Sequence, residues 1–367
     1  MKFRAAVLNG VGAPLTVDTL TMAPLQANDV LVRVRASGLC HTDLEVIQGT
    51  LAYPMPIVLG HEGAGVVEAV GSAVSRVKKG DHVICSWNPH CGHCFYCERG
   101  VPILCEPYKR NEPRGLLLDG SSRLSRDGAP VNHFFTTSTH AELTVVPESG
   151  AIAVSKEIPF DRACIIGCGV MTGVGAAVRK ARVEPGASVL VIGCGAVGLN
   201  VLQGARLAGA TTIIAVDVGA ARLARARQFG AQHAIEATGE GVLDEVRALT
   251  AGRGADHVFE AAGREAAFRL AVEAVRPAGQ VVWLGKINVA AEVAFRWGSL
   301  MGEKRIVRSS YGDAVPQRDF PWLVEQYLEG RLMLDELITR RIALDEINDG
   351  FADLAQGIGT RTVIQFP

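Results

Sequence analysis

The stretch that decides the fold reads Val189-Leu190-Val191-Ile192-Gly193-Cys194-Gly195-Ala196-Val197-Gly198. An apolar run typical of a buried strand leads directly into a G-x-G-x-x-G turn, and residues 197–207 then have the apolar pattern of a helix. An acidic residue, Asp217, follows at the end of the next predicted strand, nineteen positions after Gly198. This order of strand, glycine turn, helix and acid predicts the first βαβ unit of an open parallel sheet.

The glycines of this turn predict a dinucleotide-binding site. Gly193 allows the tight turn, Gly195 lets the backbone approach a pyrophosphate, and Gly198 lets the helix pack closely on the strand. The start of the helix, at Ala196 and Val197, presents free N–H groups that can bind phosphate. The alternative is a glycine turn that binds no ligand.

Two charged residues bear on the choice of dinucleotide. Asp217 would accept hydrogen bonds from the adenosine ribose hydroxyls, and its charge would repel a 2′-phosphate, so NAD is favoured over NADP. Arg222 would contact the ribose or accommodate a phosphate, although a residue on a helix can equally be a solvated surface residue.

The surrounding sequence predicts an α/β protein with two domains. Residues 170–310 alternate short apolar runs with Ala- and Arg-rich helical stretches, as expected of a doubly wound parallel sheet. Residues 1–169 are strand-rich with long loops, and the tail 311–367 is too short to fold alone, so we expect it to pack on this first domain. The strands expected in the parallel sheet are 188–193, 212–217, 233–236, 256–260, 280–284 and 306–309. Elsewhere we expect strands at 3–8, 30–35, 57–70, 82–87, 142–146, 338–344 and 362–366, and a helix at 320–328.

Composition excludes several classes of protein. The chain has 367 residues, 48% hydrophobic and 20% charged, which describes a compact globular protein. Its 37 basic and 38 acidic residues, without a Lys/Arg block, indicate no nucleic-acid partner. We find no secretory segment and no apolar run of membrane-spanning length, so we expect no membrane association and a cytoplasmic location. In a reducing compartment, nine cysteines indicate metal or reactive sites before disulfides.

Four of these cysteines have the spacing of a metal site. Three follow a C-x₂-C-x₂-C pattern and a fourth comes eight residues later, which suffices for the closed thiolate set that holds structural zinc. An iron–sulfur cluster uses similar spacings, but this run lacks the Cys-Pro ending of bacterial ferredoxins. His90 and His93 lie in the same loop and are then bystanders. The four cysteines are Cys91, Cys94, Cys97 and Cys105.

A second candidate metal site is formed by separated residues. His61 and Glu62 adjoin in a glycine-rich stretch, where His61 alone is either a buried histidine or a metal ligand. Cys40 ends a predicted strand, and Cys168 stands between two glycines. Three protein ligands and one open position are the arrangement of catalytic zinc. The other cysteines, which we interpret as small buried residues, are Cys85, Cys164 and Cys194.

Together these motifs resemble the zinc-containing alcohol dehydrogenases of the medium-chain dehydrogenase/reductase superfamily. The resemblance covers essentially the whole chain. It implies a GroES-like catalytic domain at 1–169 and 311–367, with a structural-zinc lobe at 88–113, and an NAD-binding Rossmann domain at 170–310. It also implies a catalytic zinc on Cys40, His61 and Cys168. The motifs that carry the resemblance are Cys40-His41-Thr42-Asp43, residues 60–71, the cysteine lobe, residues 113–139, Gly167-Cys168-Gly169, the glycine turn and Arg361-Thr362-Val363-Ile364.

The resemblance assigns further residues to the cofactor. His41 and Arg361 would contact the pyrophosphate, and Thr172 would lie against the nicotinamide.

Other residues would serve the reaction itself. Zinc lowers the pKa of a bound water from about 16 to about 7, so a bound alcohol would lose its proton near neutral pH and pass hydride to the nicotinamide. Thr42 would accept the alcohol proton, although it can also be a plain turn hydroxyl. Asp43 would orient His61, and Glu62 would do likewise or transiently replace water on zinc.

Two departures from the family pattern concern proton transfer and substrate. Many relatives have a relay histidine three residues after the threonine, where this chain has Glu45, which either replaces it or is an exposed helical residue. The loop 48–53 carries no acid, whereas glutathione-dependent formaldehyde dehydrogenases use acidic residues in it. Three aromatic residues among the pocket positions favour a bulky, apolar or aromatic primary alcohol over ethanol. These pocket positions are Leu51, Trp87, Phe134 and Phe135.

The expected function is the reversible NAD-dependent oxidation of a primary alcohol to its aldehyde, of the general or the aryl-alcohol type. One alternative is dehydrogenation of an S-(hydroxymethyl)thiol adduct of formaldehyde. An alternative of another class is a non-catalytic zinc- and dinucleotide-binding protein, which would have no need to keep both the open zinc site and Thr42. The apolar last strands of the parallel sheet predict a homodimer through a shared sheet.

Overall fold

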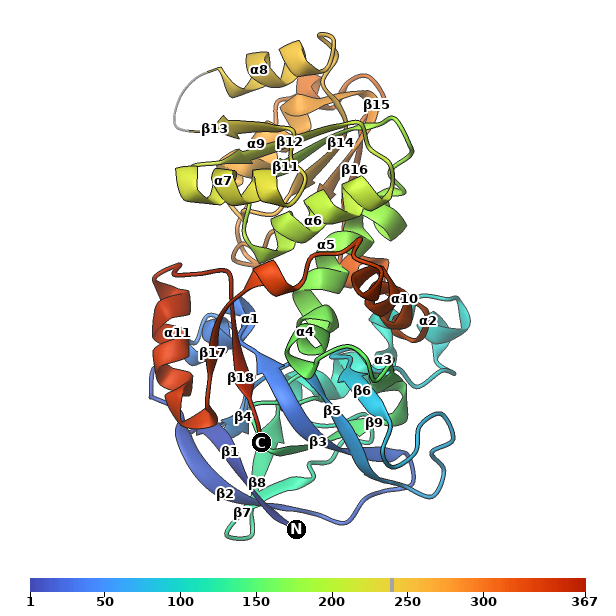
Figure 1. The fold of residues 1–367 in the computed structure, drawn as a ribbon, viewed down its shortest axis with the longest axis vertical. Coiled ribbons are helices and arrows are strands. Elements are labelled where there is room, and N and C mark those ends of the chain that lie inside the picture. The colour runs from blue at the N-terminus through green and yellow to red at the C-terminus, as the bar shows by residue number, and fades with distance from the viewer. Residues whose placement is uncertain (238–240) are drawn as a thin grey trace. The chain divides into compact units, whose positions relative to one another are not determined.

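The computed structural model describes residues 1–237 and 241–367. The chain forms two compact units, the first made of residues 1–168 and 315–367, the second of residues 169–314 (Figure 1). The C-terminal tail belongs to the first unit because its strand β18 (Arg361–Gln365) pairs with β3 (Asp29–Gly38).

The second unit is built on the expected parallel sheet, whose six strands run in the order β13-β12-β11-β14-β15-β16. Every neighbouring pair is parallel, so the prediction of a doubly wound sheet is confirmed. The strands are β11 (Ser188–Ile192), β12 (Thr212–Asp217), β13 (His233–Glu236), β14 (Ala255–Glu260), β15 (Val275–Trp283) and β16 (Arg305–Arg308). The helices are α5 (Met171–Gly175), α6 (Ala196–Leu207), α7 (Ala220–Gln228), α8 (Val242–Leu249) and α9 (Glu265–Ala274).

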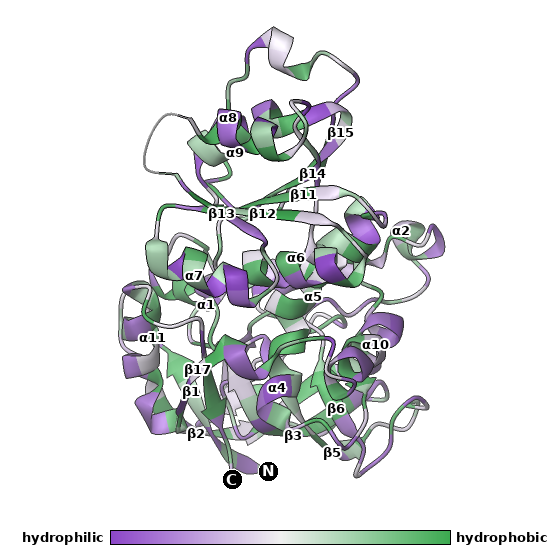
Figure 2. Ribbon diagram, turned by 45° about the horizontal axis from the view of Figure 1, so that its top comes forward, coloured by the Kyte–Doolittle hydropathy of each residue, from purple (hydrophilic) through white to green (hydrophobic). Residues whose placement is uncertain are grey.

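Apolar side chains of this sheet and its helices form a continuous core. Leu190, Ile214 and Val258 of the central strands pack with Val246 of α8 and Ala271 of α9. Figure 2 shows hydrophobic residues along the strands β12 and β14, and both hydrophobic and hydrophilic residues on the helices around the sheet. Burial of this kind contributes about 25 cal/mol for each Å² of apolar surface removed from water, and it makes the sheet a rigid base for the loops at its edge.

The first unit contains a closed barrel, β1-β2-β7-β8-β4, and a second sheet in the order β10-β6-β5-β3-β18-β17, with β9 paired to β3. Its strands are β1 (Lys2–Leu8), β2 (Thr16–Met22), β3, β4 (Ile57–Val58), β5 (Glu62–Val70), β6 (His82–Cys85), β7 (Leu124–Arg126), β8 (Ala129–His133), β9 (Leu143–Pro147), β10 (Ala151–Ala153), β17 (Ile338–Ile342) and β18. Its helices are α1 (His41–Ile47), α2 (Phe95–Glu98), α3 (Glu106–Asn111), α4 (Phe160–Ile165), α10 (Pro316–Leu328) and α11 (Ile347–Ala355).

Residues 57–70, expected as one interrupted strand, form two strands that belong to different sheets. β4 is part of the barrel and β5 part of the second sheet. Gly60 lies between them with a φ of 96°, a conformation that favours glycine, and a Cβ there would collide with His140. The change of sheet at Gly60 is what brings the next residue, His61, to a strand end.

One helix corrects the expectation that no apolar run approaches membrane-spanning length. The helical stretch Phe160–Ala181 has 22 residues and is long and apolar enough to cross a membrane. Of its most apolar window, 78% is buried within the protein, as in the core helix of a globular fold. The predicted domain boundary at 169/170 falls within this stretch, and π-helical turns at 166–170 and 176–181 keep the helix continuous.

Candidate active site and cofactor sites

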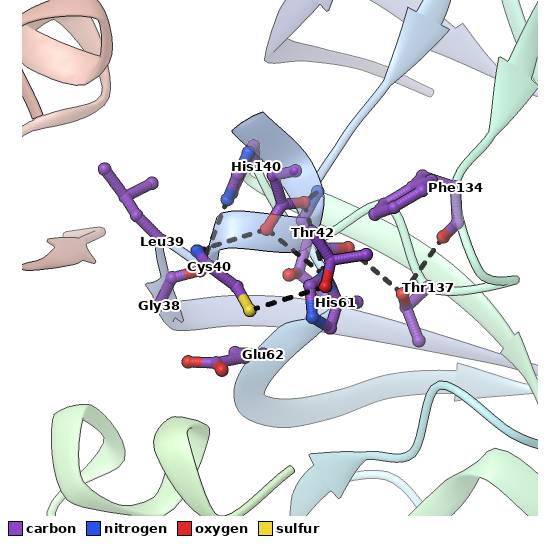
Figure 3. Close-up of polar contacts among 12 residues, drawn as sticks. Gly38, Leu39, Cys40, Thr42, His61, Glu62, Phe134, Thr137 and His140 are labelled. Carbon is purple, nitrogen blue, oxygen red and sulfur yellow. Dashed lines mark hydrogen bonds and ion pairs between the residues drawn. The ribbon is translucent and has the colours of Figure 1, made fainter. Parts of the chain in front are cut away.

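A buried cluster unites the separated residues expected to bind the catalytic metal. One ligand atom from each of Cys40, His61, Glu62 and Cys168 lies within 4.8 Å of the others. Cys40 directly precedes α1, His61 directly precedes β5, and Cys168 lies in a π-helical turn, a feature frequent at functional sites. Figure 3 shows the Cys40 sulfur gathered with the side chains of His61 and Glu62.

The Asp43 carboxylate holds the segments that carry two of these residues. It is fully buried, and its Oδ2 accepts a hydrogen bond from the Cys40 N–H at 3.2 Å. Its Oδ1 accepts the Gly60 N–H at 2.9 Å, and Oδ2 lies 3.2 Å from Nδ1 of His61. An Nδ1 that donates to a carboxylate leaves Nε2 of His61 as a metal ligand, which is the arrangement expected around metal-binding histidines.

The pKa shifts of the residues in this cluster are those expected of a cation-binding site. A hydrogen bond from Cys168 lowers the pKa of the Cys40 thiol well below its usual value, against the effect of burial. Burial lowers the pKa of His61, but Asp43 and Cys40 raise it to about 10. The same hydrogen bond, together with burial, raises the pKa of Cys168 well above its usual value, so the two thiols share a proton that a metal ion would displace. Two sulfurs with one imidazole fit zinc.

Glu62 and Arg361 form a buried ion pair beside this cluster. Arg361 Nη2 lies 3.1 Å from Glu62 Oε1, and its Nη1 donates to the carbonyl of Leu39 at 3.0 Å. Burial raises the pKa of Glu62 to about 7, while Arg361 opposes that shift. Only 5% of Arg361 is exposed. Its guanidinium therefore contacts this cluster in addition to any contact that it makes with a cofactor.

The glycine turn has the geometry expected for dinucleotide binding. Gly193 has a φ of 95°, and its N–H donates to the carbonyl of Val216 at 2.8 Å. A Cβ on Gly195 would meet only open space, so the backbone there is accessible to a ligand, whereas a Cβ on Gly198 would collide with the Gly193 carbonyl. Helix α6 starts at Ala196, one residue before its predicted start.

Asp217 stands beside this turn at the end of β12. Its Oδ2 accepts the Cys194 N–H at 2.8 Å, and its Oδ1 accepts the Gly219 N–H at 3.0 Å. Arg222 is largely exposed, with Nη1 3.4 Å from Oδ1 of Asp217. The carboxylate thus fixes the turn in addition to any role toward a ribose.

Comparisons with known proteins show the family of this chain. Residues 26–159 match the family model of the alcohol dehydrogenase GroES-like domain, and residues 196–329 match that of the zinc-binding dehydrogenases. The chain belongs to the zinc-containing alcohol dehydrogenase family. The predicted GroES-like and Rossmann folds are thereby confirmed, and NAD and zinc are the cofactors that its glycine turn and cysteine groups fit.

Three relatives illustrate the similarity over whole chains. The S-(hydroxymethyl)glutathione dehydrogenase of Paracoccus denitrificans is 39% identical, with all of both chains covered. The structure of an alcohol dehydrogenase zinc-binding domain protein from Burkholderia ambifaria has a TM-score of 0.96 at 38% identity, covering 100% of this chain and 99% of the other. The structure of benzyl alcohol dehydrogenase from Acinetobacter calcoaceticus has a TM-score of 0.95 at 33% identity and full coverage of both chains.

The dehydrogenase also has the four-cysteine group expected in its lobe. The sulfurs lie within 4.8 Å of one another, and no histidine belongs to this group within the described residues. The backbone N–H of Glu106 lowers the pKa of Cys94 to about 6, and burial raises that of Cys105 to about 12. Four sulfurs at this separation fit a closed, structural zinc site. The members are Cys91, Cys94, Cys97 and Cys105.

Aromatic rings surround the His61 side of the dehydrogenase cluster. The Phe135 ring lies 5.4 Å from the His61 ring and 5.3 Å from the Trp87 ring, measured between centroids. Phe134 is fully buried, and its ring centroid lies 4.3 Å from that of Phe135 and 5.6 Å from that of His61. Sequence reasoning missed Tyr53, whose ring lies 5.0 Å from that of Phe134. The sequence interpretation of loop 48–53 used its lack of acids and Leu51 but left out Tyr53, although an aromatic residue in that loop was itself a signal.

The remaining predicted residues lie as follows. Thr42 Oγ1 is 3.9 Å from the Cys40 sulfur, which places a hydroxyl directly beside a metal ligand. His41 is exposed and Glu45 half-buried, both on α1. Leu51 is half-buried, and its N–H donates to the Glu45 carbonyl at 3.1 Å. Thr172 belongs to α5 in the second unit.

Proposed function

We propose that this alcohol dehydrogenase reversibly oxidises a bulky, apolar or aromatic primary alcohol to the aldehyde and transfers the hydride to NAD. The aromatic wall of Phe135, Trp87 and Tyr53 beside His61 is the observation that carries the proposal. Aromatic side chains next to the reacting centre favour a flat apolar substrate, because ring contacts add to the burial of apolar surface.

The backbone near Phe135 supports a functional role for this wall. Phe135 has a φ of 47°, a left-handed conformation that is strained for a bulky residue. The segment is tied to the metal-binding strand end because the Thr137 hydroxyl donates to the Gly60 carbonyl at 3.0 Å. The ring position is therefore set together with that of His61.

In this proposal Cys40, His61 and Cys168 hold the catalytic zinc. Zinc bound there lowers the pKa of a hydroxyl group and polarises a carbonyl. Asp43 keeps His61 in the tautomer that presents Nε2. The Thr42 hydroxyl accepts the proton that the alcohol loses and passes it onward, and Glu45, on the same helix, is the candidate for the next acceptor.

The cofactor residues complete the proposal. The N–H groups at Ala196 and Val197 bind the pyrophosphate, and Asp217 favours NAD over NADP. His41 and Arg361 contact the pyrophosphate and Thr172 the nicotinamide, while Arg222 adjusts the charge around the ribose.

Steady-state kinetics with a panel of alcohols test the substrate class. We expect a kcat/KM with NAD that is higher for benzyl alcohol than for ethanol. Phe135→Ala should lower kcat/KM for benzyl alcohol by about tenfold, because a ring contact is lost, and affect ethanol less. A wild-type preference for ethanol, or for NADP, would contradict the corresponding part of the proposal.

A second candidate substrate is an S-(hydroxymethyl)thiol adduct of formaldehyde. The observation that favours it is the whole-chain similarity to a protein named S-(hydroxymethyl)glutathione dehydrogenase. The absence of an acid from residues 48–53 argues against it. Formaldehyde with glutathione or mycothiol, compared with benzyl alcohol in the same assay, separates the two substrates.

We also propose that the enzyme is a cytoplasmic homodimer that joins the parallel sheets of two copies. Strand β16 is at the edge of its sheet and can accept a further strand. Near it in sequence, Trp297 is 82% and Met301 62% exposed, which is unusual for large apolar residues. Sedimentation of the wild type and of Trp297→Glu tests this, since a monomeric wild type would contradict it.

A further inference from the structure

A buried acid with no role in the sites above lies at the carboxyl edge of the parallel sheet. Glu260 is the last residue of β14, and its side chain is fully buried. β14 pairs with β11, the strand that leads into the glycine turn. The strand order reverses between β11 and β14, and open α/β sheets bind their ligands at such a switch point.

The carboxylate of Glu260 binds backbone groups of the loop that follows it. Its Oε1 accepts the N–H of Ala262 at 2.9 Å and that of Gly263 at 2.7 Å. Burial raises the pKa of Glu260, and N–H groups of this loop and of Gly285, which follows β15, oppose the shift. One buried side chain thus organises the ends of two neighbouring strands.

The same loop packs directly against the glycine turn. A Cβ on Gly193 would lie 2.7 Å from the Ala262 nitrogen and 2.8 Å from the Ala261 carbonyl carbon. A Cβ on Gly285 would collide with Oε2 of Glu260 and with the Gly263 nitrogen. The backbones therefore touch with no room for side chains, so a shift of the loop would be transmitted to the turn.

We propose that Glu260 is a positioning residue for the dinucleotide: its carboxylate fixes residues 261–264 against Gly193 and so sets the shape of the cofactor site. It acts through the backbone and has no contact with the cofactor. The inference rests on the NAD-dependent function proposed above.

Two substitutions of Glu260 separate the effect of side-chain length from the effect of charge. Glu260→Gln keeps an acceptor oxygen at the same distance but removes the charge, whereas Glu260→Asp keeps the charge and is one methylene short of the two N–H groups. NADH binding is measured directly by calorimetry on the zinc-loaded full chain. We expect the Kd to rise by about tenfold or more in Glu260→Asp and by less than about threefold in Glu260→Gln. The reason is that only Glu260→Asp loses the two hydrogen bonds from the loop N–H groups to the side chain. Amide hydrogen exchange of residues 261–264 should rise in parallel.

Asp256 provides the matched control on the same strand. It lies at the opposite end of β14, where its Oδ2 accepts the Ser188 N–H at 2.7 Å and its Oδ1 pairs with Arg276 at 2.5 Å. Asp256→Asn should lower the melting temperature but leave the Kd for NADH within about twofold, because this end of the strand is remote from the glycine turn.

Three results would overturn the inference: wild-type affinity in Glu260→Asp, equal loss in Glu260→Gln and Glu260→Asp, or equal loss in Asp256→Asn. Should Glu260→Asp not fold, Glu260→Met, which has the length but no comparable acceptor, replaces it with the same expectation. A wild type that fails to bind NADH would instead refute the proposed function.

Discussion

Two groups in the first unit use the same donor, the cysteine sulfur, in opposite surroundings. The Cys40 group has three buried members and a half-buried Cys168, and it includes a histidine and a carboxylate. The lobe group has sulfur only, and three of its four cysteines are partly exposed. The two groups thus differ both in their ligands and in their exposure.

The difference lies in what surrounds the sulfurs. In the buried group, side chains balance and orient the ligands: Asp43 against His61, and Arg361 against Glu62. In the lobe, backbone N–H groups do so, with Glu106 N–H donating to the Cys94 sulfur at 3.4 Å. Catalytic zinc sites in general combine an open ligand position with ionisable neighbours, whereas four thiolates fill the coordination sphere of a structural zinc.

The largest expected effect comes from removing a ligand of the buried group. Cys40→Ser should lower kcat/KM by about a thousandfold or more, because the group that acidifies the alcohol is lost or displaced. Metal analysis should show that the buried site loses zinc while the lobe keeps it. Full activity in this variant would refute the open zinc site and favour a second-site reaction or a different metal-binding set.

A smaller effect should follow from changing what orients the ligand. Asp43→Asn keeps the shape of the side chain but removes its charge and can present an amide N–H to the Nδ1 of His61. We expect the affinity for the catalytic zinc, or the activity, to fall by about 10- to 100-fold. Metal titration against a competing chelator measures the affinity. An unchanged affinity for zinc would show that the charge of Asp43 does not contribute to metal binding, and the contrast with the lobe would then fail.

The sequence predicted those parts of the fold that depend on short-range patterns. All six parallel strands and the glycine turn lie close to their expected positions, because a buried strand followed by a helix leaves an apolar signal within one segment. Strands β7 and β8 were missed, although Asp127-Gly128 between them is a hairpin turn sequence with φ values of 51° and 83°. Exposed β2 was missed because few of its residues are buried.

The candidate site was predictable in composition but not in detail. Cys40, His61 and Cys168 could be named because their chemistry is specific, and the structure brings them together. The ion pair of Arg361 with Glu62 joins residues about three hundred positions apart, and no local pattern reveals it. The enclosed position of Phe134 likewise depends on tertiary packing.

The smallest effect on catalysis should come from removing one sulfur of the four-cysteine lobe. This variant tests most directly the contrast between the two cysteine groups. Cys97→Ser removes one of four sulfurs, so the lobe should lose its zinc and the melting temperature should fall by several degrees, because zinc binding contributes to folding. Since the lobe has no open position for a substrate, kcat/KM per folded molecule should stay within about threefold of wild type. Thermal unfolding and kinetics on the same preparation, with zinc counted per chain, measure both quantities. A loss of activity as large as that of Cys40→Ser, in protein that remains folded, would mean that the lobe does more than stabilise, and the division between a reactive and a structural site would fail.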